Sequence, residues 1–188
     1  FIIAERGITL QTPSAGSVGT SQLANLGITN DKIANSTLEV GKVASSLKNT
    51  PSFKAHRNSN FSASDSTTTV ITFDDEEWDT NSAYDTSNGR FTCPSGEEGK
   101  YVFYASARNA TSTDTTRFVI VIRKNGTGIA QANNNNGDED SVVVSAATNL
   151  AASDYVDVSI FQNTGATKTI FGDAPDKTTF FGYKLIGV

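Results

Sequence analysis

From residue 52 onward the apolar residues recur at every second position, which favours β-strands over helices throughout this part of the chain. Tyr101 and Phe103, for example, would share one face of a strand, with Val102 between them on the other face. The same alternation appears in residues 68–73, 118–123, 155–161 and 179–186. About eight to ten short strands of this kind, separated by polar turns, predict an all-β fold, an antiparallel jelly-roll sandwich.

Several of these predicted strands carry large residues on both faces, which is typical of a sheet that is covered on both sides. One side would meet the opposing sheet of the sandwich, and the other would meet a second subunit. Asn-Gly pairs at residues 88–89, 125–126 and 136–137 fall between predicted strands and favour tight hairpin turns. The alternation therefore predicts a sandwich and a subunit contact on its outer surface.

Residues 18–44 repeat every ten residues, and this register predicts an elongated segment before the sandwich. Two columns of large apolar residues recur in step: Val18, Ile28 and Leu38 in one, and Leu23, Ile33 and Val43 in the other. A decad with so little apolar surface cannot enclose a core, so each repeat must bury these side chains on neighbouring repeats or on other chains. We therefore predict two parts, a lead-in and oligomeric stalk over residues 1–51 and a head over residues 52–188.

Composition excludes several classes of function. The net charge of the 188 residues is −5 and no basic cluster with interleaved aromatic residues occurs, so nucleic acid is not an expected partner. The apolar runs are far shorter than the roughly 20 residues of a membrane span, so membrane insertion is not expected. The single cysteine, Cys93, is predicted to be a small buried residue. The single histidine, His56, leaves little room for a His-dependent catalytic or metal site, and no cofactor is expected.

Two acidic clusters are the candidates for a metal or catalytic site. Residues 74–77 with Asp79 form one cluster, and residues 138–140 form the other. Calcium prefers several carboxylate oxygens, but neither cluster has the Asp-x-Asp-x-Asp-Gly spacing of a calcium loop. Paired carboxylates can hydrolyse glycosides, yet neighbouring acids on a strand point to opposite faces. Solvated loops are the favoured interpretation, and no catalytic or metal-binding residue is predicted.

A polar segment and a set of aromatic residues are the candidates for binding. Asn133, Asn134, Asn135 and Asn136 are predicted to form a loop between two strands, and their amides could face a receptor. A solvated turn without a partner explains the same residues and is the preferred interpretation. Large aromatic residues are expected in the core or at a subunit interface, where their area dominates packing. These residues are Trp78, Tyr101, Tyr104, Phe180 and Phe181.

Six short motifs occur in order in the second part of the chain. They are Phe73-Asp74, Tyr84-Asp85 with residues 89–94, residues 99–103, Lys124-Asn125-Gly126, residues 150–156 and residues 180–185. Together they resemble the globular heads of the complement q-subcomponent and tumour necrosis factor superfamily over about residues 52–188. The resemblance implies a ten-stranded jelly roll that assembles as a homotrimer. Two turns depart from the family pattern: Ser153 replaces the usual glycine, and residues 95–98 lengthen the loop before Gly99.

The decads resemble a second group of proteins. Residues 16–24, Gly-Ser-Val-Gly-Thr-Ser-Gln-Leu-Ala, are similar to repeats in the fibres and surface appendages of bacteriophages. No Gly-X-Y run of a collagen stalk precedes the head. The decads are therefore expected to replace such a stalk, with their two apolar columns as the trimerisation contacts.

The two resemblances together imply a non-enzymatic, homotrimeric structural protein of a bacteriophage. The head would form the tip of a fibre or appendage on the surface of the virion, where it would contact a host-cell glycan or protein in the extracellular medium. The N-terminal region would bind other virion proteins. Two alternatives stay open: a decoration or cement protein on the capsid with a projecting head, and a secreted binding module with a complement-like head.

Overall fold

The computed structural model describes residues 14–15, 33, 43, 47–109, 117–134, 141–175 and 177–186. The chain separates into two units, residues 1–43 and residues 44–188. Within the described residues the chain forms strands and turns and contains no α-helix, as the two-residue alternation predicts. All of these strands belong to the second unit.

Thirteen strands are present in the described residues. In chain order they are β1 (Ser52–His56), β2 (Phe61–Ala63), β3 (Thr67–Val70), β4 (Asp75–Asp79), β5 (Tyr84–Asp85), β6 (Arg90–Thr92), β7 (Gly99–Asn109), β8 (Phe118–Lys124), β9 (Thr127–Asn134), β10 (Ser141–Leu150), β11 (Tyr155–Gln162), β12 (Lys168–Phe171) and β13 (Thr179–Lys184). The alternating segments predicted from the sequence overlap β3, β7, β8, β11 and β13, although residues 71–73 and 185–186 lie outside the strands.

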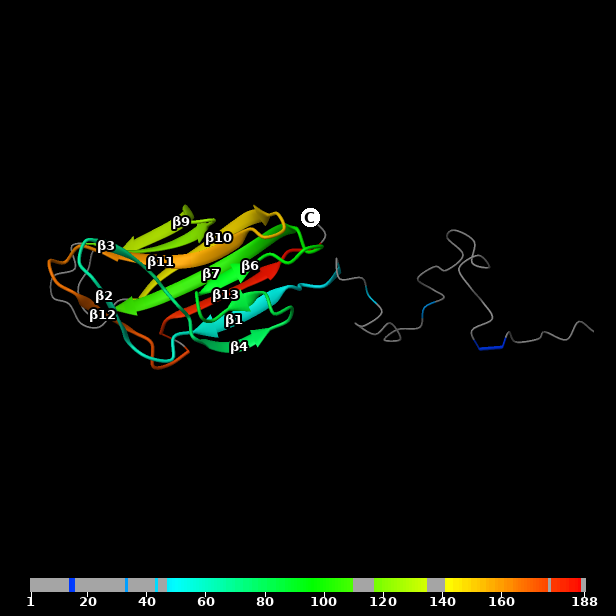
Figure 1. The fold of residues 1–188 in the computed structure, drawn as a ribbon, viewed down its shortest axis with the longest axis horizontal. Helices are drawn as coiled ribbons and strands as arrows, with labels where there is room; N and C mark the ends of the chain where they lie inside the picture. The colour runs from blue at the N-terminus through cyan, green and yellow to red at the C-terminus, as the bar shows by residue number, and fades with distance from the viewer. Residues whose placement is uncertain are drawn as a thin grey trace, which may run out of the picture. The chain divides into compact units, whose positions relative to one another are not determined.

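The strands form two antiparallel sheets packed face to face (Figure 1). In sheet A, β10, β7, β13, β1 and β4 are neighbours in that order, and β12 and β2 continue from the end of β7. In sheet B the order is β5, β6, β11, β8 and β9, with β3 also paired to β11. The predicted antiparallel jelly-roll sandwich is confirmed. In sheet A, β10 and β4 are lateral strands on opposite sides (Figure 1).

Aromatic rings fill the space between the two sheets. Phe53 of β1 stacks on Tyr84 and on Phe91, with ring centroids 4.8 and 5.1 Å apart. Phe180 of β13 meets Phe53 edge-on at 4.9 Å. Tyr101 of β7 is also fully buried and lies on the same face of the strand as Phe103, as the alternation predicts. Burying a side chain of this size contributes roughly 1.5–3 kcal/mol, so this cluster holds the two sheets together.

Of the two described Asn-Gly pairs, Asn125-Gly126 forms the predicted tight hairpin turn, whereas Asn88-Gly89 ends a longer loop, residues 86–89, between the paired residues Asp85 and Arg90. Asn125 (φ 51°) and Gly126 (φ 79°) close the hairpin between β8 and β9, as expected of a type I′ turn. Gly89 (φ 73°) lies so close to the carbonyl of Ile71 that a Cβ has no room there. Ser153, where the family resemblance predicts a glycine, also has a positive φ of 68°. The sandwich therefore tolerates this departure at the expense of an unfavourable backbone angle.

Candidate interaction surface

The outward face of sheet A carries large apolar side chains that remain exposed or half-buried. We call this surface the aromatic face and define it by Val143 of β10, Val102 and Tyr104 of β7, Phe181 and Tyr183 of β13, and Trp78 of β4. Strand alternation explains why these residues point away from the core. On β7, for example, Phe103 and Ala105 are fully buried, so Tyr104 between them points outward.

The strand register brings members of the aromatic face into one row. Tyr104 of β7 pairs with Phe181 of β13, and Phe181 pairs with Lys54 of β1. Lys54 in turn pairs with Trp78 of β4. The rings of Tyr104 and Phe181 stack with centroids 4.9 Å apart, and the Lys54 ammonium lies 5.7 Å from the centroid of the Trp78 ring. The row crosses the sheet from β7 to the lateral strand β4.

The two most exposed members of the aromatic face lie on the two lateral strands of sheet A. Val143 of β10 is 47% exposed and Trp78 of β4 is 46% exposed. Contiguous apolar surface of this kind usually marks a contact with another macromolecule. Tyr, Trp and Phe are enriched at the buried centre of such contacts. The aromatic face is therefore the candidate functional surface of the described residues.

Charged residues border the aromatic face along β4. The Lys54 ammonium lies 2.7 Å from the Glu77 carboxylate, and the His56 ring lies 3.7 Å from the same carboxylate. The pKa of Glu76 is raised by desolvation and, to a smaller extent, by the negative charge of Asp79. Strand β4 carries four carboxylates, those of Asp75, Glu76, Glu77 and Asp79, beside the Lys54 ammonium and the His56 ring. This margin of the face is therefore acidic.

A groove of about 230 Å³ lies at the opposite side of sheet A. It is lined by Lys100 of β7, by Ala147, Thr148 and Asn149 of β10, and by Leu185 just after β13. Ala147 pairs with Val102 of the aromatic face, so the groove opens beside that face. The ammonium of Lys124 donates a hydrogen bond of 2.8 Å to the Asn149 carbonyl, and it is also ion-paired with Asp154 at 2.8 Å. The groove combines apolar walls with one cation, Lys100, which no described carboxylate pairs with.

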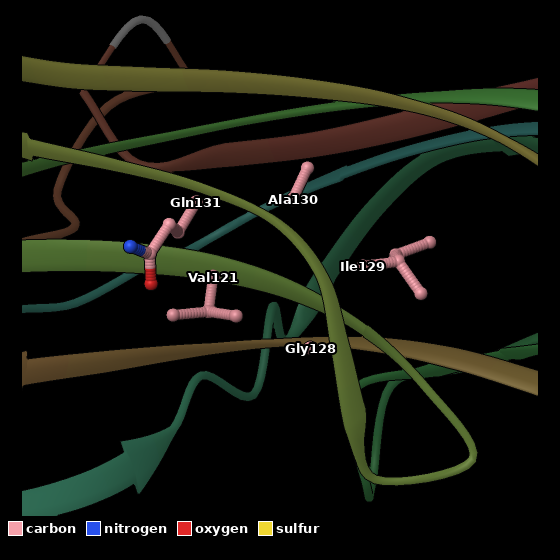
Figure 2. A pocket seen from close by; sticks show the side chains of 5 residues that line it. All are labelled: Val121, Gly128, Ile129, Ala130 and Gln131. Atoms are coloured by element: carbon pink, nitrogen blue, oxygen red, sulfur yellow. The ribbon is translucent and has the colours of Figure 1, made fainter.

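A second hollow of about 230 Å³ lies beside the β8–β9 hairpin of sheet B (Figure 2). Val121, Gly128, Ile129, Ala130 and Gln131 line it (Figure 2). A bulge between Ile122 and Arg123 interrupts the strand pairing at this point, and the missing side chain of Gly128 leaves space beside Val121. The lining contains no charged group, and we assign no ligand to this hollow.

Most residues predicted to trimerise the stalk lie outside the described residues, namely Val18, Leu23, Ile28 and Leu38. Ile33 is described and is 40% exposed, and Val43 is described and half-buried. Their role in subunit contact stays a prediction.

The predicted asparagine loop is wrong for its first two residues. Asn133 and Asn134 belong to β9, where they pair with Val119 and Phe118 of β8. Alternation of small and polar residues continues through them, so the strand extends further than composition suggests. Asn135 and Asn136 lie outside the described residues. A receptor contact by these four residues stays a prediction.

The solvated-loop interpretation of the first acidic cluster is also wrong. Residues 75–79 form β4, which pairs with β1 at the side of sheet A. Charged residues suit an edge strand because they discourage pairing with other sheets. Trp78, within this strand, does not lie in the core. Residues 138–140, the second cluster, lie outside the described residues.

The other predicted core or interface aromatics divide between the two faces of sheet A. Tyr101 and Phe180 are fully buried in the core, whereas Tyr104 and Phe181 lie on the aromatic face.

Cys93 is buried as predicted, and burial raises the pKa of its thiol. Among the described residues, no group of three or more His, Cys, Asp or Glu side chains is placed to hold a metal ion. No helix in the same residues is long and apolar enough to cross a bilayer.

Comparisons with known proteins agree with this architecture. The family model described as C1q domain matches residues 52–185. The globular domain of zebrafish complement 1qA protein is 21% identical over 72% of this chain and 97% of its own, with a TM-score of 0.51. Murine APRIL at pH 5.0 is 13% identical over 71% and 98%, with a TM-score of 0.56. Eiger TNF from S. frugiperda is 15% identical over 73% and 93%, with a TM-score of 0.53. No curated protein matches.

Proposed function

Because the chain belongs to the C1q domain family, we propose that it is a homotrimeric, non-enzymatic binding module whose heads associate through the aromatic face. The observation that carries the proposal is the row formed by Tyr104, Phe181 and Trp78 on the outward side of sheet A. A single head leaves this row in contact with water. Three heads around a threefold axis remove it from water and give every protomer the same contacts.

The trimer would present three copies of the same binding surface on one particle. Three weak contacts that act together bind more tightly than one, because the second and third contacts form at a high effective concentration. The aromatic face is occupied in this arrangement, so the outward side of sheet B and the loops between strands are left for a receptor.

We place this trimer on the surface of a bacteriophage particle, at the tip of a fibre or appendage that contacts a host-cell glycan or protein. Support for this placement comes from the decads, because residues 16–24 resemble bacteriophage fibre repeats. The N-terminal region would then hold the head on other virion proteins. A secreted binding module is the second candidate, since the family match spans residues 52–185 alone and is independent of the decads.

The homotrimer is tested by sedimentation equilibrium on the full chain. We expect three times the chain mass of 19.9 kDa. Phe181→Asp should weaken association at least tenfold, because it places a charge in the centre of the contact. The matched control is Ile129→Asp, which alters an exposed apolar residue of sheet B and should leave the trimer intact. A wild-type chain that stays monomeric at micromolar concentration contradicts the proposal.

The placement on a virion is tested by immunogold electron microscopy with antibodies against the head, together with binding of the labelled trimer to host cells. Gold at fibre tips and saturable cell binding are the expected results. A copy number near that of the capsid subunit would instead identify a decoration protein. Absence of the protein from purified particles would support the secreted module.

A further inference from the structure

We infer that Trp78 of one protomer inserts into the groove beside β10 of the next protomer, so that the two sides of sheet A interlock around the trimer. The inference depends on the proposed homotrimer and adds the identity of two contact sites to it. A closed ring of three identical chains needs a head-to-tail contact, in which two different surfaces of each chain meet. Trp78 and the groove lie on opposite sides of sheet A, β4 and β10 (Figure 1).

Trp78 has the properties of a residue that binds in a pocket. Its side chain is the only indole in the chain, and the residue is 46% exposed. The bulge in β4, which adds one residue opposite the step from Lys54 to Ala55, places Trp78 beside Lys54 at the end of the row. Tryptophan in a desolvated pocket is among the strongest single contributors to subunit contacts. The exposed Trp78 ring on β4 is therefore the side chain best suited to enter a pocket of another protomer.

The groove offers the matching concave site. Ala147 and Leu185 provide apolar walls, and the side chain of Ala147 is too small to fill the space. Through Ala147 the groove is continuous with Val102 of the aromatic face. A ring that enters the groove thus extends the same contact that covers the aromatic face, without a separate binding surface.

Charge complementarity selects a second copy of this chain as the occupant. Glu77 accompanies Trp78 on the outward side of β4, and Asp75 lies on the same side. Lys100 lines the groove and forms no ion pair with any described residue, whereas Lys124 beside it is paired with the Asp154 carboxylate at 2.8 Å. When Trp78 enters the groove, the acidic margin of β4 meets the ammonium of Lys100. Opposite charges at the rim of a contact favour the correct orientation of the partners.

The single tryptophan makes the inference directly measurable in the unmodified full chain. Emission of Trp78 and its quenching by acrylamide are recorded across a dilution series, and association is followed in parallel by sedimentation. We expect blue-shifted emission and several-fold weaker quenching in the trimer than in the dissociated chain. A trimer with fully quenchable Trp78 overturns the inference and leaves the homotrimer standing. A chain that is monomeric at every concentration overturns both.

Cross-linking supplies a second test that does not depend on the indole. Trp78→Cys is combined with Ala147→Cys in a Cys93→Ala background and treated with a short bismaleimide. We expect covalent dimers and trimers in high yield. The matched control replaces Trp78→Cys with Ile129→Cys, which lies on sheet B and should give little cross-linking. An associated double variant that yields no more covalent product than the control contradicts the inference.

Discussion

Ser153, in the turn between β10 and β11, has a backbone φ of 68° and donates its N–H to the Cys93 carbonyl at 2.9 Å. A side chain in the left-handed region costs about 1–2 kcal/mol, whereas glycine adopts it freely but gains entropy in the unfolded chain. Ser153→Gly should therefore raise the free energy of unfolding by roughly 0.5–1 kcal/mol. Urea denaturation at a fixed protomer concentration measures this change.

The control for this prediction is Ser95→Gly. Ser95 is exposed in a turn and is not among the residues with positive φ. Glycine there only adds freedom to the unfolded chain, so stability should stay constant or fall slightly. Equal stabilisation by both substitutions would show that the backbone angle of Ser153 is not the cause.

Asp157 is a carboxylate with no exposed surface on the outward side of sheet B. The Arg123 guanidinium donates two hydrogen bonds to it, at 2.7 and 2.9 Å, while Arg90 packs 4.1 Å above the Tyr155 ring. Arg123→Met leaves the carboxylate buried without its main partner and should lower the free energy of unfolding by about 3 kcal/mol. The double variant Arg123→Met/Asp157→Leu should recover most of this loss in the same denaturation assay. A double variant no more stable than the single one would contradict the argument.

At the scale of the element, Asp154 connects two turns. Its carboxylate accepts hydrogen bonds from the Lys124 ammonium, the Asn125 side-chain amide and the Ala151 N–H, at 2.8, 2.7 and 2.8 Å. The Lys124 and Asn125 hydrogen bonds lower the pKa of Asp154 to about 2. The β8–β9 turn is thereby tied to the turn that precedes β11.

This lowered pKa predicts an acid dependence of stability. Because the pKa is lower in the folded chain than the ordinary value of 3.8, the ionised Asp154 stabilises the fold above that value. The contribution is lost as the pH falls from 3.8 toward 2. Asp154→Asn should be less stable than wild type at pH 7, with a smaller fall in unfolding free energy between pH 4 and pH 2. Urea denaturation across this range measures the effect, and an unchanged acid dependence would contradict it.

Strands are predicted correctly from the sequence where the burial of one face makes apolar residues recur at every second position. Tyr101 and Phe103 lie in the core because every second residue of β7 faces the opposing sheet. The prediction fails at residues 75–79, where strand β4 is held by pairing with β1 and has no apolar alternation of its own. It also leaves Tyr101 and Tyr104 undistinguished, since both faces of β7 are apolar and only the packed sandwich determines which one faces inward.

At the scale of the whole molecule, one surface connects the fold to the proposed function. The jelly-roll head buries its core without help, yet the aromatic face of sheet A and the groove beside β10 remain in contact with water. A contiguous set of outward apolar residues of this kind is expected where assembly covers it. Large residues on both faces of one strand predict a subunit contact from the sequence. The proposed pairing of Trp78 with the groove could not be predicted in this way, because it depends on the order of the strands across sheet A.

The decads are the second subunit contact that the sequence predicts, and a substitution of Ile33 tests this prediction. If their apolar columns pack between chains, Ile33→Asp places three charges in one contact and should weaken trimerisation at least tenfold, or about 1.4 kcal/mol. The head should keep its wild-type near-ultraviolet circular dichroism. In a double variant with Phe181→Asp, the two losses should add, because the substitutions fall in separate units of the chain. Sedimentation measures all three dissociation constants, and a value for Ile33→Asp equal to wild type would confine subunit contact to the head.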